Sequence, residues 1–374
     1  MNDHSNILLT GASGILGSHI LFELIQLYTE GILSGKIVLI VRSGKKLPAL
    51  QRVKEILQNP FVPEKMKSIS VEEALKHIVL VDSDLHHFSR EKLPALPGGY
   101  TVIHAAASVN LGQNEAIKDE LYRNNYLGTV HFIHEILPVT KKFVFISTAY
   151  SSGHREGMIS NDFFHCKDYH FRNPYEYFKH QTEIHVRDIC SKQQIEWQIL
   201  RPSIICGRLI EAPLFAISRF LVFYLFARYV INLRLRIGNQ FIQLHVPEEA
   251  AINIVPVDYV AKVVVSVMDK TVRQLNIVHP KSVSCRTLFE KGFALIDFNN
   301  YSFSGHRSEP ANPVERLLYS TIGQQLGPYI DTPGHDFDIN GLQAFNQEFN
   351  VPEIETNFCE LLSFAANRKF VDLY

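Results

Sequence analysis

Short apolar runs recur along the first three quarters of the chain, and most are followed by a stretch with helical periodicity. Each run has the length of one buried strand, and we expect strands at 7–9, 36–42, 77–81, 100–107, 142–148, 197–205 and 275–278. Strands that alternate with helices at this spacing form right-handed crossovers and a parallel sheet. The pattern predicts an α/β fold, a Rossmann doubly wound parallel sheet with a smaller, mostly helical C-terminal substrate lobe.

The regular alternation ends beyond Gly207, and this change predicts a domain boundary. We expect residues 1–207 to form the Rossmann domain, with residues 250–280 returning to it. Residues 208–249 and 281–374 are expected to form the substrate-binding lobe. The chain has 374 residues, of which 46% are hydrophobic, and this is enough to bury the cores of both parts.

Glycines at three-residue intervals follow the first apolar run. Gly11, Gly14 and Gly17 stand between the strand that ends at Thr10 and a helix through residues 19–27. In dinucleotide-binding folds the first glycine allows a tight turn, the second lets backbone approach a pyrophosphate, and the third lets helix pack on strand. The helix N-terminus adds free N–H groups and a positive dipole end. Strand, glycine turn and helix in this order favour a dinucleotide site over a turn without a ligand.

The end of the second strand indicates which dinucleotide is bound, because the residue that reads the adenosine ribose lies there. An acid would accept a hydrogen bond from the 2′-hydroxyl of NAD, but the chain has Arg42, Lys45 and Lys46 and no acid. A cluster of cations suits a 2′-phosphate. The sequence therefore predicts NADP(H), and the alternative is an ordinary solvated basic loop.

Tyr175 and Lys179 are four residues apart and lie on one face of a predicted helix. A free phenol has a pKa of about 10, which is poorly matched to proton transfer at neutral pH. A close lysine and a cationic nicotinamide ring would lower that pKa. Thr148, at the exit of the fifth strand, is placed to hydrogen-bond the same substrate oxygen. Tyr177 is the competing tyrosine, but its offset of two from Lys179 turns it away.

The composition excludes several other functions. A formal net charge of −1 gives no global basic field for nucleic acid. The five cysteines are widely spaced without Cys-x-x-Cys, and the first strand starts close to the N-terminus, so we expect reduced thiols, no signal peptide and a cytoplasmic protein. The histidines show no metal-ligand spacing. His165-Cys166 and His170 are weak candidates, and no metal site is expected.

Together these motifs resemble the extended short-chain dehydrogenase/reductases over roughly residues 5–280. The strings that carry this resemblance are Thr10-Gly-x-x-Gly-x-x-Gly17, His104-Ala-Ala-Ala107, Asn125-x-x-Gly-Thr129, Ser147-Thr148 and Tyr175-x-x-x-Lys179. Shorter strings resemble the fatty acyl-CoA reductase ("male sterility") and thioester reductase branch: Phe145-Ile-Ser-Thr-Ala-Tyr150, Arg201-Pro-Ser-Ile-Ile205 and Pro256-Val-Asp-Tyr-Val260.

The resemblance implies the residues of the site. The catalytic residues would be Thr148, Tyr175, Lys179 and Asn125, with Asn125 supporting Lys179 through a water and Lys179 also contacting the nicotinamide ribose. Pro202 and Ser203 would lie beside the carboxamide. The full set of expected cofactor-binding residues is Thr10, Gly11, Ser13, Gly14, Ile15, Leu16, Gly17, Arg42, Lys46, Asp84, Leu85, Ala105, Ala106, Ala107, Ser147, Tyr175, Lys179, Pro202, Ser203 and Ile204.

The resemblance also implies a reaction, the reduction of an acyl thioester by NADPH to an aldehyde or an alcohol. The substrate would be a small-molecule or carrier-bound acyl group, with an acyl carrier protein as a candidate partner. Many thioester reductases are preceded by adenylation and carrier domains, which we do not expect in this chain, so the acyl donor would arrive separately. One alternative is a sugar-nucleotide epimerase or dehydratase, or a hydroxysteroid-type dehydrogenase. Another is a non-catalytic NADP-binding regulator. The sequence does not determine the acyl chain, the donor or the oligomeric state.

Residues 214–231 are unusually apolar and aromatic, and three interpretations stay open. A membrane span is disfavoured, because Arg219 and Arg228 would each cost about 2.5–3.5 kcal/mol near the bilayer centre. The segment would pack as a helix against the C-terminal lobe, line a site for an acyl chain, or contact a membrane surface or a partner without spanning. If it lines the site, Phe220, Phe223 and Phe226 are expected to border the acyl chain.

Overall fold

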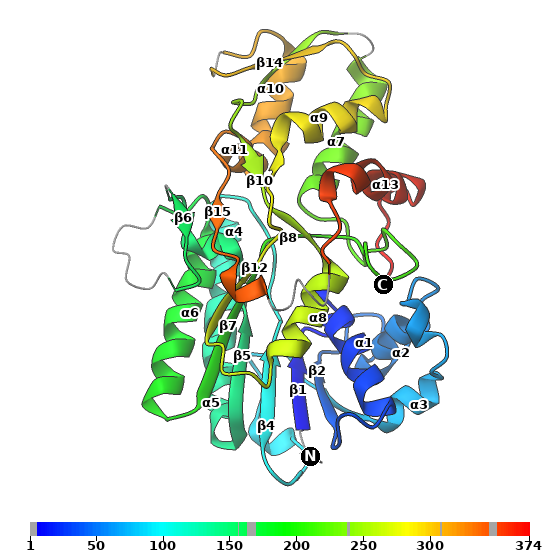
Figure 1. Cartoon of the computed structure of the whole chain (residues 1–374), viewed down its shortest axis with the longest axis vertical. Helices are drawn as coiled ribbons and strands as arrows, with labels where there is room; N and C mark the ends of the chain where they lie inside the picture. The colour runs from blue at the N-terminus through cyan, green and yellow to red at the C-terminus, as the bar shows by residue number, and fades with distance from the viewer. Residues whose placement is uncertain (1–5, 156, 163–169, 238–239, 307–308, 344–349) are drawn as a thin grey trace.

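The computed structural model describes residues 6–155, 157–162, 170–237, 240–306, 309–343 and 350–374. Its main feature is a sheet of seven parallel strands in the order β12-β7-β5-β4-β1-β2-β3 (Figure 1). The strands are β1 (Asn6–Thr10), β2 (Ile37–Val41), β3 (Ile78–Asp82), β4 (Tyr100–His104), β5 (Thr140–Ile146), β7 (Glu196–Pro202) and β12 (Gln274–Ile277). The strand order reverses between β1 and β4, which is where open α/β sheets bind ligands. The predicted Rossmann fold class is confirmed.

Alternate residues of β1 face the two hydrophobic cores that cover the sheet. Ile7 and Leu9 are fully buried in the core formed with α1, α2, α3 and α8. Leu8 points to the opposite face, where it joins the core that includes α5 and α6. The covering helices are α1 (Ile15–Thr29), α2 (Ala49–Leu57), α3 (Val71–Lys76), α4 (Glu115–Leu121), the π-helix η3 (Tyr122–Leu127), α5 (Gly128–Ile136), α6 (Pro174–Lys192) and α8 (Val257–Val267).

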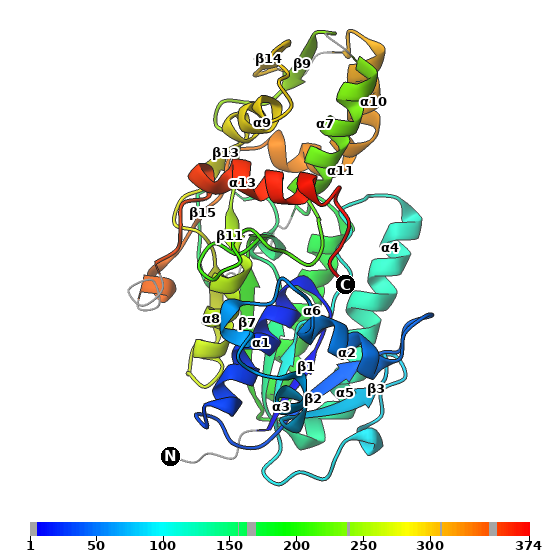
Figure 2. The ribbon, with the colours of Figure 1, turned by 90° about the vertical axis from the view of Figure 1, so that its right-hand side faces the viewer.

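A second lobe lies beyond the carboxyl ends of the strands and has its own hydrophobic core (Figure 2). Its helices and strands are α7 (Phe223–Ile237), β9 (Ile242–His245), α9 (Cys285–Ala294), β14 (Tyr301–Ser304), α10 (Pro313–Ser320), α11 (Ile322–Ile330) and α13 (Ile354–Asn367). Short strands connect the lobe and the sheet: β6 (Met158–Ile159) with β15 (Asp336–Phe337), β8 (Ile204–Cys206) with β11 (Ile254–Pro256), and β10 (Ala251–Ile252) with β13 (Val283–Ser284). Single turns complete the chain: η1 (Glu64–Met66), η2 (Arg90–Lys92), η4 (Leu137–Val139), η5 (Ala149–Ser152) and η6 (Asn340–Leu342).

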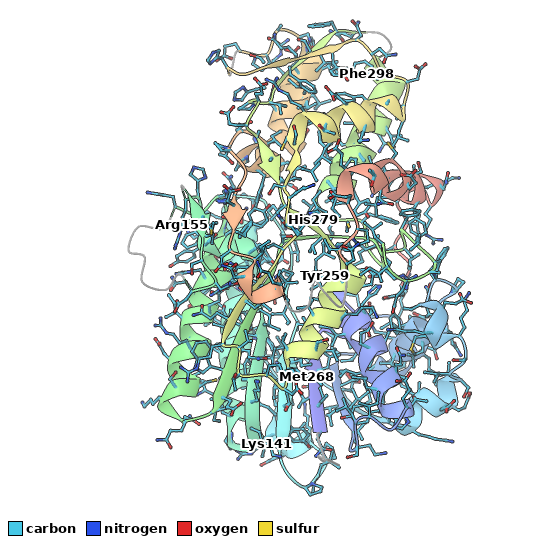
Figure 3. The ribbon with its side chains drawn as sticks, in the orientation of Figure 1. Lys141, Arg155, Tyr259, Met268, His279 and Phe298 are labelled. Atoms are coloured by element: carbon cyan, nitrogen blue, oxygen red, sulfur yellow. The ribbon has the colours of Figure 1, made fainter. Side chains whose placement is uncertain are left out.

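The junction between sheet and lobe lies midway along the molecule. Figure 3 shows Phe298 in the lobe, Lys141 near the opposite end of the sheet, and His279 between them. The backbone N–H of His279 donates to Asn253 Oδ1 at 2.9 Å, and Asn253 Nδ2 donates back to the His279 carbonyl at 2.8 Å. This pair joins the segment that leaves β12 to the segment that enters β11.

Two predicted elements differ from the structure. The strand expected at 197–205 is interrupted at Ser203 and continues as β8, which pairs with β11 instead of the main sheet. The helix expected in 214–231 begins only at Phe223, because Phe215 and Val222 have positive φ angles of 66° and 52°, which no α-helix contains. Within the described part of the chain, no helix combines the length and apolarity needed to cross a membrane.

Candidate active site

The turn between β1 and α1 has the geometry of a phosphate cradle. Gly11 has φ 76°, and a Cβ built there would lie 2.6 Å from the Ala105 carbonyl carbon, so only glycine fits without a shift. Gly17 packs just as tightly on the Gly11 backbone. Helix α1 begins at Ile15 with no side-chain cap and no acid in its first turn. Its first N–H groups therefore face the turn without a competing anion, which suits a pyrophosphate.

Three arginines lie around this turn, and two of them, Arg52 and Arg219, contact Ser13. The Arg52 guanidinium donates to Ser13 Oγ at 3.0 Å and to the Arg42 carbonyl at 2.6 Å, and Arg219 donates to the Ser13 carbonyl at 3.4 Å. Burial, and then the charges of Arg42 and Arg219, lower the pKa of Arg52. All three arginines line a cavity of about 260 Å³, which we call the cofactor cleft, whereas Lys46 is exposed and does not line it. The cleft therefore concentrates positive charge beside the phosphate turn.

The remaining walls of the cofactor cleft come from the loops after β3 and β4. Asp84, Leu85 and Ala105–107 all line it. Asp84 accepts hydrogen bonds from the backbone N–H groups of His86 and His87 and from the His87 ring. Burial opposes the charge of Asp84, but these hydrogen bonds outweigh burial and lower its pKa. The Asp84 carboxylate is consequently hydrogen-bonded within its own loop.

A buried histidine ties the two strands at the switch point together. His104 Nδ1 shares a hydrogen bond with Thr10 Oγ1 at 2.9 Å, and His104 Nε2 shares one with Thr129 Oγ1 at 3.0 Å. The same Thr10 oxygen accepts from the Ala106 N–H at 3.2 Å. Burial, reinforced by the charge of Lys179, lowers the pKa of His104 to about 3. The neutral His104 ring thus positions Thr10, which with Ala106 lines the cofactor cleft.

Tyr175 and Lys179 project from the first turns of α6. Lys179 is buried, donates from Nζ to the Ile146 carbonyl at 2.8 Å, and lies 4.8 Å from the centre of the Phe145 ring. Burial lowers its pKa to about 8, against the opposing charge of Glu183. The pKa of Tyr175 was expected to fall, but burial, and then the charge of Glu176, raise it. The expected lowering of this pKa beside a cationic nicotinamide ring stays a prediction.

Thr148 and Ser147 lie at the carboxyl end of β5. Thr148 Oγ1 accepts from the Tyr150 N–H at 3.3 Å, which leaves its own hydroxyl hydrogen for another acceptor. The hydroxyl oxygens of Ser147 and Ser203 are buried without a hydrogen-bond partner among the described residues. Pro202 and Ile204 flank Ser203 at the end of β7 and the start of β8. Two unpaired buried hydroxyls at this edge of the sheet fit a polar ligand such as a carboxamide.

Asn125 lies in the π-helix η3, a rare conformation that often marks functional sites. Its side chain accepts from the Ser108 N–H at 2.7 Å and donates to the Ser108 carbonyl at 2.9 Å, and its backbone carbonyl accepts from Thr182 Oγ1 at 3.5 Å. The side chain thus clamps the loop after β4. The bond with Thr182 connects Asn125 to α6, the helix that carries Lys179.

An apolar cavity of about 320 Å³ lies in the second lobe, and we call it the lobe cavity. It is formed mainly by α7, α9, α11 and α13, and Ile204, directly after Ser203, contributes to its wall. Phe223 and Phe226 of the aromatic segment line it. Phe220 does not: it packs against Phe364, Phe370 and Tyr224. The aromatic segment therefore both packs the lobe and lines its cavity.

The structure brings most of the predicted residues to one edge of the sheet and adds others. Arg52 and Arg219 were missed, because no short motif marks a cation that reaches the turn from a following helix or a distant loop. The lobe cavity was also missed as a whole, since its walls come from four separate helices. No group of metal-binding side chains occurs among the described residues, which include His170 but neither His165 nor Cys166.

Comparison with known families supports the fold and the cofactor site. The chain matches the model of the male sterility protein family over residues 9–264. A Drosophila melanogaster protein named "Putative fatty acyl-CoA reductase CG8303" is 27% identical over 183 residues, which are 47% of this chain and 31% of that protein. The chain thus matches about a third of the length of this curated relative.

Solved structures of the same fold cover nearly the whole chain. The terminal R domain from the myxalamid PKS-NRPS biosynthetic pathway has a TM-score of 0.66 at 18% identity, covering 99% of this chain and 93% of that one. A thiolation-reductase di-domain from an archaeal non-ribosomal peptide synthetase has a TM-score of 0.64 at 18% identity, covering 98% and 91%. UDP-glucuronic acid 4-epimerase from Bacillus cereus, in complex with UDP-glucuronic acid and NAD, has a TM-score of 0.62 at 15% identity, covering 97% and 99%. At these identities the similarity establishes the fold.

Proposed function

This chain belongs to the male sterility protein family of the extended short-chain dehydrogenase/reductases, and from this premise we propose that it is an NADPH-dependent reductase of acyl thioesters. Membership makes it an NAD(P)-dependent oxidoreductase. The preference for NADPH, the substrate and the catalytic residues are the proposal. One observation carries it: the cationic cofactor cleft, the first turns of α6 with Tyr175 and Lys179, and the wall of the lobe cavity at Ile204 all lie at the carboxyl ends of the parallel strands.

The preference for NADPH rests on the charge of the cofactor cleft. Arg42 and Arg52 follow β2, where the adenosine ribose lies in this fold, and their guanidinium groups suit a 2′-phosphate. Asp84 lines the same cleft, but its carboxylate is held by its own loop. The residues present fit a phosphorylated ribose better than a free 2′-hydroxyl.

The proposed catalytic roles use the side chains at the carboxyl end of β5 and in the first turns of α6. Bound NADPH would supply a hydride to the carbonyl carbon of the thioester. Tyr175 Oη donates a proton to the carbonyl oxygen, since a phenol is protonated at neutral pH. Thr148 donates a hydrogen bond to the same oxygen. Lys179, anchored on the Ile146 carbonyl, keeps two further N–H donors for the nicotinamide ribose.

The thiohemiacetal formed in this way then releases its thiol. Tyr175 Oη takes back the hydroxyl proton as the C–S bond breaks, the bonding electrons leave with sulfur, and the thiolate takes a proton from solvent to become a free thiol. The carbon product is an aldehyde. A hydride from a second NADPH and a second proton from Tyr175 would convert the aldehyde to an alcohol.

The lobe cavity supports an acyl group as the substrate. Its lining is almost entirely aliphatic and aromatic, and about 320 Å³ is within the range of ligand pockets. Ile204 brings its wall next to Ser203, at the end of the site where the nicotinamide is expected. A sugar diphosphate, the substrate of the alternative epimerase function, would find few polar partners in that cavity.

The test is NADPH oxidation against a panel of substrates, with acyl-CoA thioesters of increasing chain length, an acyl carrier protein thioester, ketones and UDP-sugars. We expect turnover with the thioesters, and NADH measured in parallel to be the poorer reductant. Turnover with ketones or UDP-sugars alone would replace the proposal with one of the alternatives.

A further inference from the structure

One tyrosine of the second lobe contacts both the lobe cavity and the helix that carries Tyr175. Tyr329, near the end of α11, is 7% exposed, and its ring lines the lobe cavity. Its hydroxyl accepts a hydrogen bond from Asn173 Nδ2 at 2.7 Å and donates one to Glu176 Oε1 at 2.7 Å. Asn173 and Glu176 stand on either side of Pro174 and Tyr175, so one hydroxyl holds both flanks of the proposed proton donor.

The contacts around Tyr329 also fix the start of α6. Asn173 is the N-cap of this helix, and its Oδ1 accepts from the Glu176 N–H at 3.1 Å. The buried Glu176 carboxylate faces Arg172 at 3.5 Å, and Arg172 Nε donates to the Pro328 carbonyl of α11 at 3.2 Å. The Arg172 guanidinium also lies 5.3 Å from the centre of the Tyr329 ring. The last turn of α11 and the first turn of α6 are therefore joined through several bonds.

We propose that Tyr329 is a positioning residue, which holds the first turn of α6 so that Tyr175 stays aligned with a substrate whose acyl chain contacts the Tyr329 ring. The inference rests on the proposed function, because it takes Tyr175 as the proton donor and the lobe cavity as the acyl site. It goes beyond that function in assigning a role to a residue that touches neither the cofactor cleft nor the reacting atoms. Burial raises the pKa of Glu176, and the Tyr329 hydroxyl and Arg172 are the groups that stabilise its charged form.

The decisive variant is Tyr329→Phe, which keeps the ring in the cavity wall and removes only the hydroxyl. Its matched control is Tyr319→Phe, which removes a hydroxyl that accepts from the His245 N–H at 2.8 Å, in the same lobe and remote from α6. Losing the bonds of the hydroxyl to Glu176 and Asn173 should lower kcat with a long-chain acyl thioester by about 10-fold. The KM for that substrate and the Kd for NADPH should stay within about 2-fold, because the apolar wall and the cofactor cleft are unchanged.

Amide hydrogen exchange gives a readout that needs no substrate. The peptide that spans residues 172–178 should exchange about 10-fold faster in Tyr329→Phe and at the wild-type rate in Tyr319→Phe. If Tyr329→Phe fails to fold, Asn173→Ser serves instead, because serine retains the N-cap acceptor but loses the amide that reaches Tyr329.

The outcomes separate the two proposals. A kcat within 2-fold of wild type together with unchanged exchange in 172–178 would overturn the positioning role, as would an equal loss in Tyr319→Phe. If the wild-type protein reduces a carbonyl compound other than a thioester, the proposed function fails, and the same comparison with that compound still decides the role of Tyr329. If no substrate is turned over, the exchange rates alone decide it.

Discussion

Lys179 Nζ lies 2.8 Å from the carbonyl oxygen of Ile146, so the ammonium of α6 is anchored at the carboxyl end of β5. Thr148 follows Ile146 by two residues, and Tyr175 precedes Lys179 by one helical turn. This single bond therefore brings the strand end that carries Thr148 together with the helix that carries the proposed acid. The predictions about catalysis follow from it.

The phenol of Tyr175 is expected to supply the proton for reduction. Tyr175→Phe should lower kcat by about 10²–10⁴-fold, the usual share of a positioned general acid, while NADPH binding is nearly unchanged. Steady-state kinetics and a fluorescence titration with NADPH measure the two effects. Tyr177→Phe is the control, since Tyr177 is 43% exposed on the same helix and should lose little. A Tyr175→Phe variant with more than half of the wild-type activity would point to another donor.

Lys179 should set the alkaline limit of cofactor use. Burial lowers its pKa to about 8, whereas the pKa of Tyr175 is raised, so Lys179 is the first of the two to lose its proton as the pH rises. The kcat/KM for NADPH, which reports the free enzyme, should be level below pH 8 and fall about 10-fold per pH unit above it. Lys179→Arg should move this fall to higher pH, because a guanidinium stays protonated. If kcat/KM for NADPH still falls above pH 8 in Lys179→Arg, a group other than Lys179 causes the fall.

The same shift has a consequence for stability. An exposed lysine in the unfolded chain titrates near pH 10.5, so between about pH 8 and pH 10.5 the unfolded state binds the extra proton. The contribution of Lys179 to the free energy of unfolding should therefore become more favourable as the pH rises through this window. Burial of the charged Lys179 lowers the free energy of unfolding by its full amount only below pH 8, where the lysine is protonated in both states.

The arginines at the cofactor cleft should determine the preference for NADPH. Removing either Arg42 or Arg52 by substitution with alanine should weaken NADPH binding by about 10–150-fold, equivalent to roughly 1.5–3 kcal/mol, with a much smaller effect on NADH. Lys46→Ala is the comparison, because Lys46 is exposed and outside the cleft. Binding titrations with both cofactors measure the ratio. Equal weakening for NADPH and NADH, or a larger effect at Lys46, would contradict the assignment.

Phe226 should limit the length of the acyl chain. It lines the lobe cavity and also a small enclosed space beside Leu318, and its ring lies 4.7 Å from that of Phe289. Phe226→Ala should join the two spaces, and each added methylene of substrate should then gain up to about 0.8 kcal/mol until the larger space is full. The chain-length optimum of KM should move to longer substrates.

The control for this prediction is Phe220→Ala. Phe220 is 3% exposed and lies outside the lobe cavity, so its loss should lower stability by about 3–5 kcal/mol without moving the optimum. Thermal unfolding and the chain-length series, measured on both variants, separate packing from substrate contact. A shift of the optimum in Phe220→Ala, or none in Phe226→Ala, would count against an acyl cavity.

The sheet could be predicted from the sequence because its strands are short apolar runs buried on both faces, such as β1 and β2. The structure of the second lobe could not be predicted in this way. Its core is assembled from Tyr150 and from separate segments between residues 204 and 370. The positive φ angles that delay the start of α7 occur at Phe215 and Val222, and neither is a glycine that would have indicated such a conformation. Such conformations depend on tertiary contacts, which a local pattern does not contain.

The candidate site was predictable where the chain itself fixes the geometry. Gly11 and Gly17 are held by close backbone contacts, and Tyr175 and Lys179 by helical spacing. Of the two predicted cations after β2, Arg42 lines the cofactor cleft and Lys46 does not, whereas Arg52 of α2 lines it without having been predicted, because its approach to Ser13 depends on the fold. In the structure, burial and the charge of Glu176 raise the pKa of Tyr175, and the lowering of this pKa beside a cationic nicotinamide ring stays a prediction.

The central claim is the reduction of an acyl thioester, and one assay tests it most directly. The protein is incubated with NADPH and a long-chain acyl-CoA, and NADPH oxidation is followed together with the release of free thiol. The account predicts that thiol is released in step with NADPH oxidation, in a ratio of about one to one for an aldehyde product or one to two for an alcohol, and that Tyr175→Phe suppresses both. NADPH oxidation without thiol release, or turnover with UDP-sugars in place of the thioester, would contradict it.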